Sequence, residues 1–316
     1  MACRGVHTSW MRFSGFIGAC LIALAGLRPT AAAPLAMAEI APGVYVHEGV
    51  QEDATVANED AIANVGFVVG AAAVMVVDPG GSALEGRSLH EAVRAVTDKP
   101  IRYVVLTHVH PDHIFGAAAF TGDHPAFIGH ARLPGALAER GTYYRRALER
   151  SLGERAAGSE IVAPTLLVAD VLSIDLGNRV VDIRAHGPAH TDNDLTLYDR
   201  ETRTLWAGDL LFVERLPVVD GSILGWLREL DALRTLPAVR AIPGHGPAAV
   251  DWPAGAEGET RYLQAVVAGT RAAIRGGIDI GEAWRHVAQE ERGRWLLFDD
   301  YHPRNVTAAY KELEWE

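Results

Sequence analysis

The six residues from His108 to His113 constrain this chain more than any other part of its sequence. Three histidines and one aspartate occupy four of these positions, in the pattern His-x-His-x-Asp-His. His108 and His110 are two residues apart in an extended loop, so their imidazoles can point the same way. Pro111 fits the first turn of a helix, from which Asp112 and His113 leave in different directions. One short loop can therefore supply ligands to two neighbouring metal ions.

Three further candidate ligands stand alone, each at the end of a predicted strand: His190, Asp209 and His245. A single histidine such as His190 more often has a structural role, and Asp209 could cap a helix. His245 lies between two glycines, where the backbone approaches a neighbour closely. Together with the six-residue motif they complete seven ligands for two sites. Neutral imidazole and carboxylate are groups that suit zinc.

The first 38 residues differ from the rest of the chain and indicate export. Arg4 and Arg12 precede an apolar stretch from Phe13 to Leu27, and alanine-rich residues follow. A basic start, a short apolar core and small residues at the exit are typical of a secretory signal peptide. The apolar stretch is about 15 residues long, short for a membrane span of roughly 20. We predict a signal peptide over residues 1–38 with cleavage near residue 33 or 38; an uncleaved anchor helix is the alternative.

The composition of the remaining chain disfavours several partners. Both cysteines, Cys3 and Cys20, lie in the leader, so a metal site must use other ligands. Without residues 1–38 the chain has 26 basic and 40 acidic residues, a net charge of −14. Such a surface disfavours nucleic acid, whose phosphates require a basic face, and anionic lipid. We expect a small-molecule substrate, no nucleic acid, no membrane in the mature form, and a periplasmic or secreted location.

Short β-branched runs alternate with helical patterns in both halves of the chain. The first half predicts strands at 62–69, 74–77 and 101–106 and helices at 82–97 and 131–152. The second half predicts strands at 171–176, 180–185, 195–198, 204–207 and 239–242 and helices at 222–235, 257–275, 280–290 and 305–314. Strands and then helices, twice over, predict two similar halves packed sheet against sheet with helices outside. No linker separates the halves, so we predict one domain over residues 39–316, with a C-terminal helical extension from about 255.

The order and placement of the ligand motifs resemble the metallo-β-lactamase superfamily. The resemblance covers about residues 40–250 and implies an α/β fold, a four-layer αβ/βα sandwich with the site between the sheets at one edge. It assigns the seven ligands to two zinc ions: His108, His110 and His190 to one, Asp112, His113 and His245 to the other, and Asp209 to both. Asp78 matches the buried supporting aspartate of that family, although turn formation explains this residue equally well.

Longer stretches narrow the resemblance to the quinoprotein relay system zinc metallohydrolases, which are similar to a sulfur-oxidation-associated metallohydrolase. These stretches are Ala61–Val69, Thr107–His113, Ala189–Asp194, Pro217–Ser222 and Pro303–Ala309. Members of that family tend to accompany periplasmic alcohol oxidation that depends on pyrroloquinoline quinone (PQQ). The resemblance therefore implies a periplasmic quinoprotein as a candidate partner.

A two-zinc site implies hydrolysis by a zinc-bound hydroxide. Zinc lowers the pKa of its bound water to about 7, so hydroxide forms at neutral pH. We expect it to attack a small carbonyl substrate, such as an ester, thioester or lactone, while one zinc ion polarises the substrate oxygen. Asp112 is placed to ligate one metal and to accept a hydrogen bond from the hydroxide, which makes it the candidate catalytic residue. The group that protonates the leaving atom is left open.

Three other functions are weighed against this one. A class B metallo-β-lactamase would hydrolyse β-lactams, but those enzymes commonly use Cys where Asp209 stands or lack the bridging carboxylate. Iron oxidation chemistry is disfavoured because the diiron relatives tend to have Glu in place of His110. A non-catalytic accessory protein of a periplasmic quinoprotein is disfavoured by the complete ligand set.

Two side chains outside the ligand motifs have less defined roles. Arg215 could meet an anionic substrate, but pairing with a nearby acid such as Glu214 is the simpler expectation. His302 lies in a predicted C-terminal loop and has no evident partner in the sequence.

Overall fold

A computed structural model describes residues 1–3, 5 and 33–316 of the chain. The predicted signal peptide lies almost entirely outside the described residues, and so does Cys20. The chain separates into two units, Met1–Ala31 and Ala32–Glu316, and everything below concerns the second. Within the described residues, no helix combines the length and the apolar character needed to cross a membrane. The boundary at residue 39 stays a prediction.

The first half of the chain forms a seven-stranded sheet in the order β1-β2-β3-β4-β5-β6-β7. Its strands are β1 Ala38–Ala41, β2 Val44–His47, β3 Val65–Val69, β4 Val74–Val77, β5 Ile101–Leu106, β6 Ala126–His130 and β7 Leu166–Val168. Strands β1 to β4 pair antiparallel, and β4 to β7 pair parallel. Parallel strands need crossover connections. These are α1 (Ala83–Val96), α2 (Pro111–Ile114) with a 3-10 helix (Phe115–Asp123), and α3 (Leu133–Leu152) with a 3-10 turn (Gly153–Ala156).

The second half forms a six-stranded sheet in the order β13-β12-β11-β10-β9-β8. Its strands are β8 Val171–Asp175, β9 Val180–Ala185, β10 Leu195–Asp199, β11 Thr204–Phe212, β12 Arg240–His245 and β13 Val250–Asp251. Only β11 and β12 pair parallel, and α4 (Ile223–Leu233) connects them. After a 3-10 turn (Ala254–Ala256), the chain ends with α5 (Glu257–Arg275), α6 (Ile280–Ala283) and α7 (Phe298–Leu313). A second 3-10 turn (Gln289–Arg294) lies between α6 and α7.

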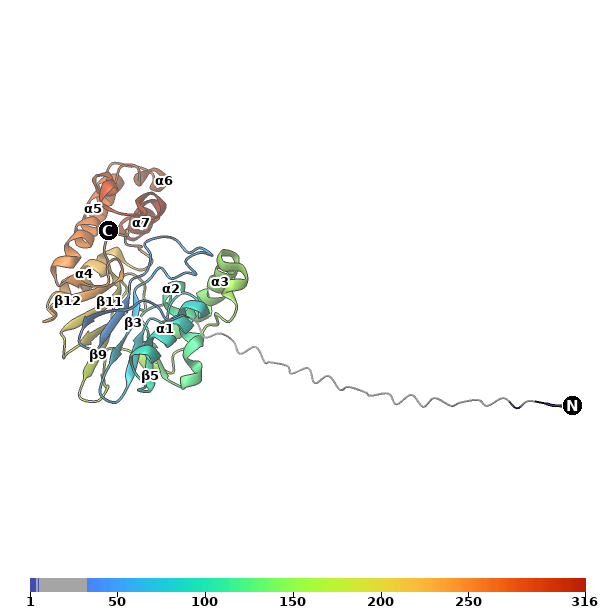
Figure 1. Cartoon of the computed structure of the whole chain (residues 1–316). Helices are drawn as coiled ribbons and strands as arrows, with labels where there is room; N and C mark the ends of the chain where they lie inside the picture. Colours follow the sequence, from blue (N-terminus) through green and yellow to red (C-terminus); the bar gives the residue numbers. More distant parts are fainter. Residues whose placement is uncertain (4, 6–32) are drawn as a thin grey trace. The chain divides into compact units, whose positions relative to one another are not determined.

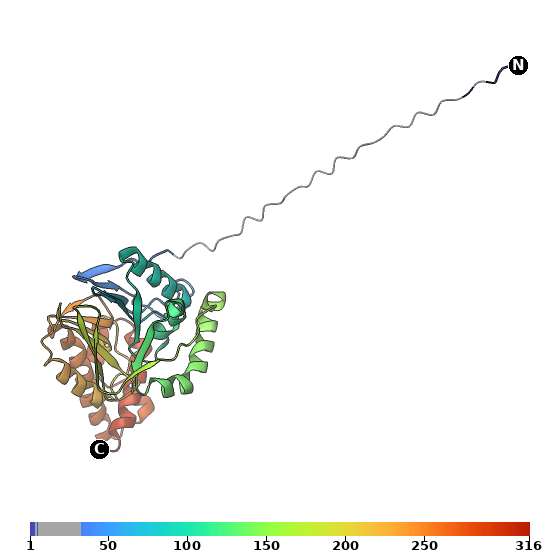
Figure 2. The same cartoon turned by 90° about the horizontal axis from the view of Figure 1, so that it is seen from below.

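Three apolar clusters divide this unit into four layers. One cluster fills the space between the two sheets, with Val68 and Val105 from the first sheet against Leu197 and Trp206 from the second. A second packs α1 and α3 on the outer face of the first sheet, and a third packs α4, α5 and α7 on the outer face of the second. Figures 1 and 2 show the helices on both outer sides of the paired sheets. The predicted four-layer αβ/βα sandwich is confirmed.

Several elements differ from their predicted bounds. Strand β11 continues past Ala207 to Phe212, because a bulge at Gly208 lets it stay paired with β12. The predicted helix at 280–290 stops at Ala283, and Ala288 has a left-handed backbone that no α-helix accepts. Helix α7 begins at Phe298, seven residues before the predicted start.

Candidate metal centre

The seven predicted ligand side chains gather at one edge of the two sheets. Each comes from the carboxyl end of a strand or from the turn that follows it, where open α/β sheets place their ligands. They form two groups whose potential ligand atoms lie within 4.8 Å of one another: His108, His110, His190 and Asp209 in the first, and Asp112, His113 and His245 in the second. The structure therefore brings together every predicted ligand and leaves none outside.

In the first group, three imidazole nitrogens point at one another. Nδ1 of His110 lies 3.1 Å from Nε2 of His108 and 2.9 Å from Nε2 of His190. The carboxylate of Asp209 completes the group, with Oδ2 3.3 Å from Nε2 of His190 and 3.7 Å from Nε2 of His108. Three imidazole nitrogens and one carboxylate oxygen are a donor set that proteins use for a four-coordinate cation.

In the second group, two imidazoles meet two carboxylates. Oδ2 of Asp112 lies 3.6 Å from Nε2 of His113 and 3.3 Å from Nε2 of His245. Asp209 reaches this group as well, with Oδ1 3.1 Å from Nε2 of His113 and Oδ2 3.4 Å from Nε2 of His245. Asp209 thus faces both groups, in the bridging position that the resemblance implies for it.

Two buried polar atoms test whether these residues fit a metal. Nε2 of His113 and Oδ1 of Asp209 are buried and lie 3.1 Å apart, but not in the geometry of a hydrogen bond, and among the described residues neither atom has a hydrogen-bond partner. Leaving a buried polar atom without a partner costs about 1–3 kcal/mol. A cation between them would satisfy both atoms, so the donor set fits the metal that the fold implies.

The outer nitrogen of every ligand imidazole meets a hydrogen-bond partner. The pairs are His108 Nδ1 with Thr107 Oγ1 (3.1 Å), His110 Nε2 with Asp220 Oδ2 (3.0 Å), His113 Nδ1 with Asp78 Oδ2 (2.8 Å), His190 Nδ1 with the Val218 carbonyl (2.7 Å) and His245 Nδ1 with the Ile62 carbonyl (2.8 Å). Such partners hold the ring in place and keep the inner nitrogen free to bind a cation.

Asp78 supports two of these imidazoles from the end of β4. Its Oδ2 accepts from Nδ1 of His113 and from Oγ1 of Thr107, and its Oδ1 accepts from the Thr107 backbone N–H, all at 2.8 Å. Thr107 in turn contacts His108. The geometry therefore favours a supporting role at the centre over a role limited to the turn.

The backbone around Asp209 leaves room for its carboxylate. Gly208, at the bulge of β11, has a φ of +51°, a conformation that glycine adopts more easily than other residues. On the neighbouring strand, a Cβ added to Gly244 would lie 1.9 Å from Oδ1 of Asp209. The two glycines explain how a carboxylate can sit within an apolar strand and still face the centre.

The charges of the two groups differ. Burial lowers the pKa of His190 to about 3 and holds that of His108 well below its usual range. Burial acts in the same direction on His113 and His245, but nearby carboxylates, Asp209 first, outweigh it and raise both pKa values. His108 and His190 of the first group therefore stay neutral, whereas in the second group protons and cations compete for the same nitrogens.

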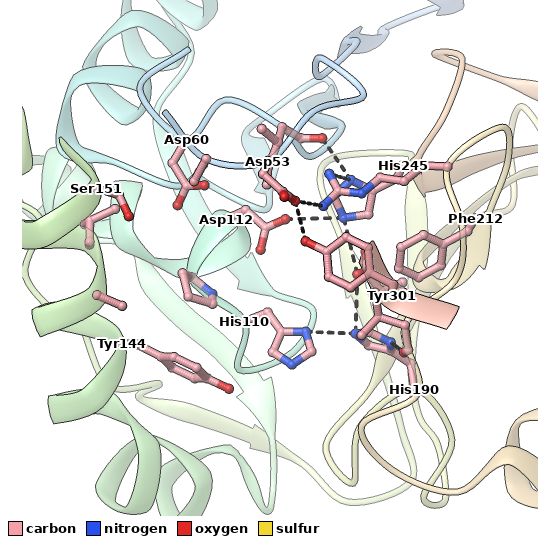
Figure 3. Close-up of a pocket in the computed structure, with 18 of the residues that line it drawn as sticks. Asp53, Asp60, His110, Asp112, Tyr144, Ser151, His190, Phe212, His245 and Tyr301 are labelled. Atoms are coloured by element: carbon pink, nitrogen blue, oxygen red, sulfur yellow. Dashed lines mark hydrogen bonds and ion pairs between the residues drawn. The ribbon is translucent and has the colours of Figure 1, made fainter. Parts of the chain in front are cut away.

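A cavity of about 400 Å³ opens onto both groups. Figure 3 shows His110 and Tyr144 on one side of it, and His190, His245 and Tyr301 on the other. Tyr144, Leu148 and Ser151 of α3 form one wall, and Phe212, Arg215 and Tyr301 form the opposite wall. A cavity of this size accepts a small molecule.

Two residues correct or extend the sequence analysis. The expected pairing of Arg215 with Glu214 is wrong: Arg215 is buried, its Nη1 donates to the Glu52 carbonyl at 3.0 Å, and its Nη2 lies 3.7 Å from Asp53. Asp220 hydrogen-bonds to His110, a role that the sequence analysis does not predict. The sequence signal for it is an acidic residue directly after the apolar pair Val218 and Val219.

Two sheets packed face to face with helices on both outer sides, and a buried His/Asp centre at one edge, define an αβ/βα sandwich protein that can bind metal ions. Residues 59–245, more than half of the chain, match the model of the metallo-beta-lactamase superfamily. The chain belongs to this superfamily.

Relatives with named activities match parts of the chain. It is 27% identical over 209 residues to a linear primary-alkylsulfatase of a Pseudomonas species, covering 55% of this chain and 39% of that protein. It is 30% identical over 188 residues to acyl-coenzyme A thioesterase MBLAC2 of Homo sapiens, covering 52% of this chain and 61% of that protein. The chain spans less than two thirds of the length of each.

Solved structures share the fold at low sequence identity. The stereoselective inverting sec-alkylsulfatase Pisa1 from Pseudomonas sp. matches with a TM-score of 0.66 and 16% identity, covering 88% of this chain and 50% of that one. A metallo-beta-lactamase from Pontibacter korlensis matches with a TM-score of 0.57 and 16% identity, covering 73% of this chain and 99% of that one. At this identity the likeness concerns the fold alone.

Proposed function

We propose that this protein is an exported hydrolase that depends on two zinc ions and cleaves a small ester, thioester or lactone. The observation that carries the proposal is the pair of ligand groups that share Asp209 at the floor of one cavity. Two zinc ions, when bound, supply a water nucleophile that ionises near neutral pH and polarise the bond under attack. His108, His110 and His190 would hold one ion, and Asp112, His113 and His245 the other.

The chain's own residues orient the nucleophile and the substrate. Asp112 lines the cavity, and only 9% of its surface is exposed. Burial would raise the pKa of Asp112, but His113 and His245 outweigh it and hold the pKa well below its usual range, so the residue stays an acceptor. An ionised carboxylate at this place would accept a hydrogen bond from the attacking water and keep it in one orientation. The apolar walls at Leu148 and Phe212 would exclude other water.

The two sequence relatives support an ester-type substrate. One is named for an alkyl sulfate and the other for an acyl-coenzyme A thioester. We favour the thioester or another carbonyl ester, because the thioesterase shows the higher identity of the two. The structural likeness to β-lactamases, at 16% identity, does not support a β-lactam as the substrate.

A substrate panel tests this function. The zinc-loaded protein would be assayed with an acyl thioester, an aryl ester, a lactone, an alkyl sulfate and the β-lactam nitrocefin. We expect hydrolysis of a carbonyl ester that is lost on metal removal, restored by zinc, and abolished in Asp112→Ala. Hydrolysis of nitrocefin or of the alkyl sulfate alone would contradict the proposed substrate class.

The periplasmic location and the quinoprotein partner are part of the same proposal. The leader pattern supports export, and the resemblance to the quinoprotein relay system metallohydrolases supports a link to PQQ-dependent alcohol oxidation. Cell fractionation and co-purification from the native host would test both. Recovery of the protein in the cytoplasm would contradict the export. A quinoprotein complex together with a wild-type phenotype in Asp112→Ala would favour a non-catalytic accessory role.

A further inference from the structure

The segment from Pro217 to Gly221 orients two imidazoles of the first ligand group. The Val218 carbonyl accepts from Nδ1 of His190 at 2.7 Å, and Oδ2 of Asp220 accepts from Nε2 of His110 at 3.0 Å. Partners of this kind set the orientation and the basicity of a metal-binding imidazole. The position of the 217–221 segment therefore sets the geometry of this group.

Asn305 of α7 holds the 217–221 segment with both ends of its amide. Its Nδ2 donates to the Pro217 carbonyl at 2.6 Å, and its Oδ1 accepts from the Val219 N–H at 2.9 Å. These two contacts flank Val218, whose carbonyl meets His190. The side chain of Asn305 is fully buried, so no water replaces either contact. A side-chain amide offers a donor and an acceptor side by side, which is what these two contacts require.

A buried chain of hydrogen bonds fixes the orientation of the Asn305 amide. Nε2 of His302 donates to the Val287 carbonyl at 2.9 Å, so its Nδ1 accepts from the Tyr262 hydroxyl at 3.0 Å. The Tyr262 oxygen then accepts from Nδ2 of Asn305 at 3.0 Å. Burial lowers the pKa of His302 and raises that of Tyr262, which keeps both in these protonation states. The sequence indicated no partner for His302, but the structure gives it two, and it lies at the far end of this series of hydrogen bonds.

We propose that Asn305 is a positioning residue through which the C-terminal helices set the metal affinity of the group His108, His110 and His190. This inference rests on the proposed function. Two of the stretches that resemble the metallohydrolase family contain no predicted metal ligand. They are Pro217–Ser222 and Pro303–Ala309. The two hydrogen bonds of Asn305 join these stretches, and Nη2 of Arg304 also lies 3.5 Å from Oδ1 of Asp220. The second group, which contains His113 and His245, draws its supports from Asp78 and Ile62. Its connection to α7 runs through Arg215, whose Nη1 lies 3.5 Å from Nδ1 of His245 and whose guanidinium lies over the Tyr301 ring, and does not involve Asn305.

The test compares two variants of helix α7 in the full mature protein. Asn305→Leu removes both contacts with little change in volume. Glu312→Gln is the matched control, because Glu312 holds Ser222 and Ile223, which contact no ligand imidazole. Each protein would be titrated with Co²⁺ alone, following the visible spectrum and the two dissociation constants, with a thermal melt of the metal-free form alongside.

We expect Asn305→Leu to weaken one Co²⁺ site by on the order of 10-fold and to change its spectrum, because losses in the supports of metal ligands have this size. The other site and both sites of Glu312→Gln should match the wild type. Unchanged Co²⁺ binding in Asn305→Leu, or equal weakening of both sites, would overturn the inference.

Tyr262→Phe keeps the test decisive if Asn305→Leu does not fold. It removes the hydroxyl that fixes the Asn305 amide and keeps the ring, so we expect a smaller weakening of the same site. No change in that variant would then overturn the inference. A wild-type protein that binds fewer than two Co²⁺ ions would overturn the proposed function, and this inference with it.

Discussion

At the scale of single residues, the centre depends on positions where a side chain is absent. Gly244→Ala would place a Cβ 1.9 Å from Oδ1 of Asp209, and the carboxylate must then move away from both ligand groups. We expect metal affinity to fall by on the order of 10- to 100-fold, which is the range seen when hydrogen-bond partners of metal ligands are removed. Metal analysis after dialysis measures this, with Gly122→Ala as control, because a Cβ at Gly122 meets nothing within 4 Å. Full metal content in Gly244→Ala would contradict the role of this glycine.

The protonation of the second ligand group predicts how metal binding depends on pH. The carboxylates around His113 and His245 raise their pKa values, so below those values protons occupy the nitrogens that a cation needs. As pH rises through the raised pKa values the protons leave, and metal affinity should increase and then level off. Calorimetric titration in buffers of different ionisation enthalpy would count the protons released. Binding that releases no protons would contradict this prediction.

Single residues also show what sequence can predict about the site. That these seven side chains lie together could be predicted, because histidine and aspartate are recognisable by residue type and spacing. The carbonyls of Val218 and Ile62, which orient two of the imidazoles, could not, because every residue has a carbonyl and only the fold selects these two. Asn305 lies far along the chain from its contacts, and no local pattern connects them.

At the scale of elements, one buried arginine, paired with an aspartate of its own sheet, connects the two sheets. Arg179, just before β9, pairs with Asp199 at the end of β10 at 2.6 Å, and its Nη1 donates to carbonyls of Pro42 and Val69 in the first sheet. Arg179→Met leaves Asp199 buried without its cation, so we expect a loss of about 3–5 kcal/mol in the free energy of unfolding. Urea unfolding measures this loss.

The control for this prediction is an exposed ion pair on the same sheet. Arg200 pairs with Asp182 at 2.7 Å but is largely exposed, and water screens such pairs so that they add little to stability. Arg200→Met should therefore unfold almost like the wild type. If Arg179→Met were as stable as Arg200→Met, Arg179 would not contribute to the stability of the packed sheets.

Element bounds were predictable where turn residues flank them and not where packing sets them. Strands β4, β5 and β9 and helix α5 match their predicted bounds. Helix α7 begins earlier than predicted because Phe298 packs on His302, with ring centroids 4.3 Å apart, and stabilises a turn before Pro303. Short strands such as β7 and β13 have too few residues to show a period, and they form by pairing with a neighbour.

At the scale of the whole molecule, packing near the start of the folded unit favours the earlier of the two predicted cleavage positions. Leu35 and Met37 pack against the apolar cluster under α1, and the Leu35 N–H donates to the Ser88 carbonyl at 3.1 Å. Cleavage near residue 38 would remove these contacts and part of β1. We therefore predict a mature protein that begins near residue 34, which the intact mass of the exported protein measures. A mass that begins at residue 39 would contradict this.

The proposed activity requires that seven side chains from both halves of the chain hold two cations. Native mass spectrometry of the mature protein, titrated with zinc, measures the number of ions bound per folded chain. We predict that the wild type binds two ions. In Asp209→Ala, both sites should bind zinc only weakly, since Asp209 faces both groups. A wild-type chain that saturates at one ion or none, or an Asp209→Ala variant that still binds two tightly, would contradict the account.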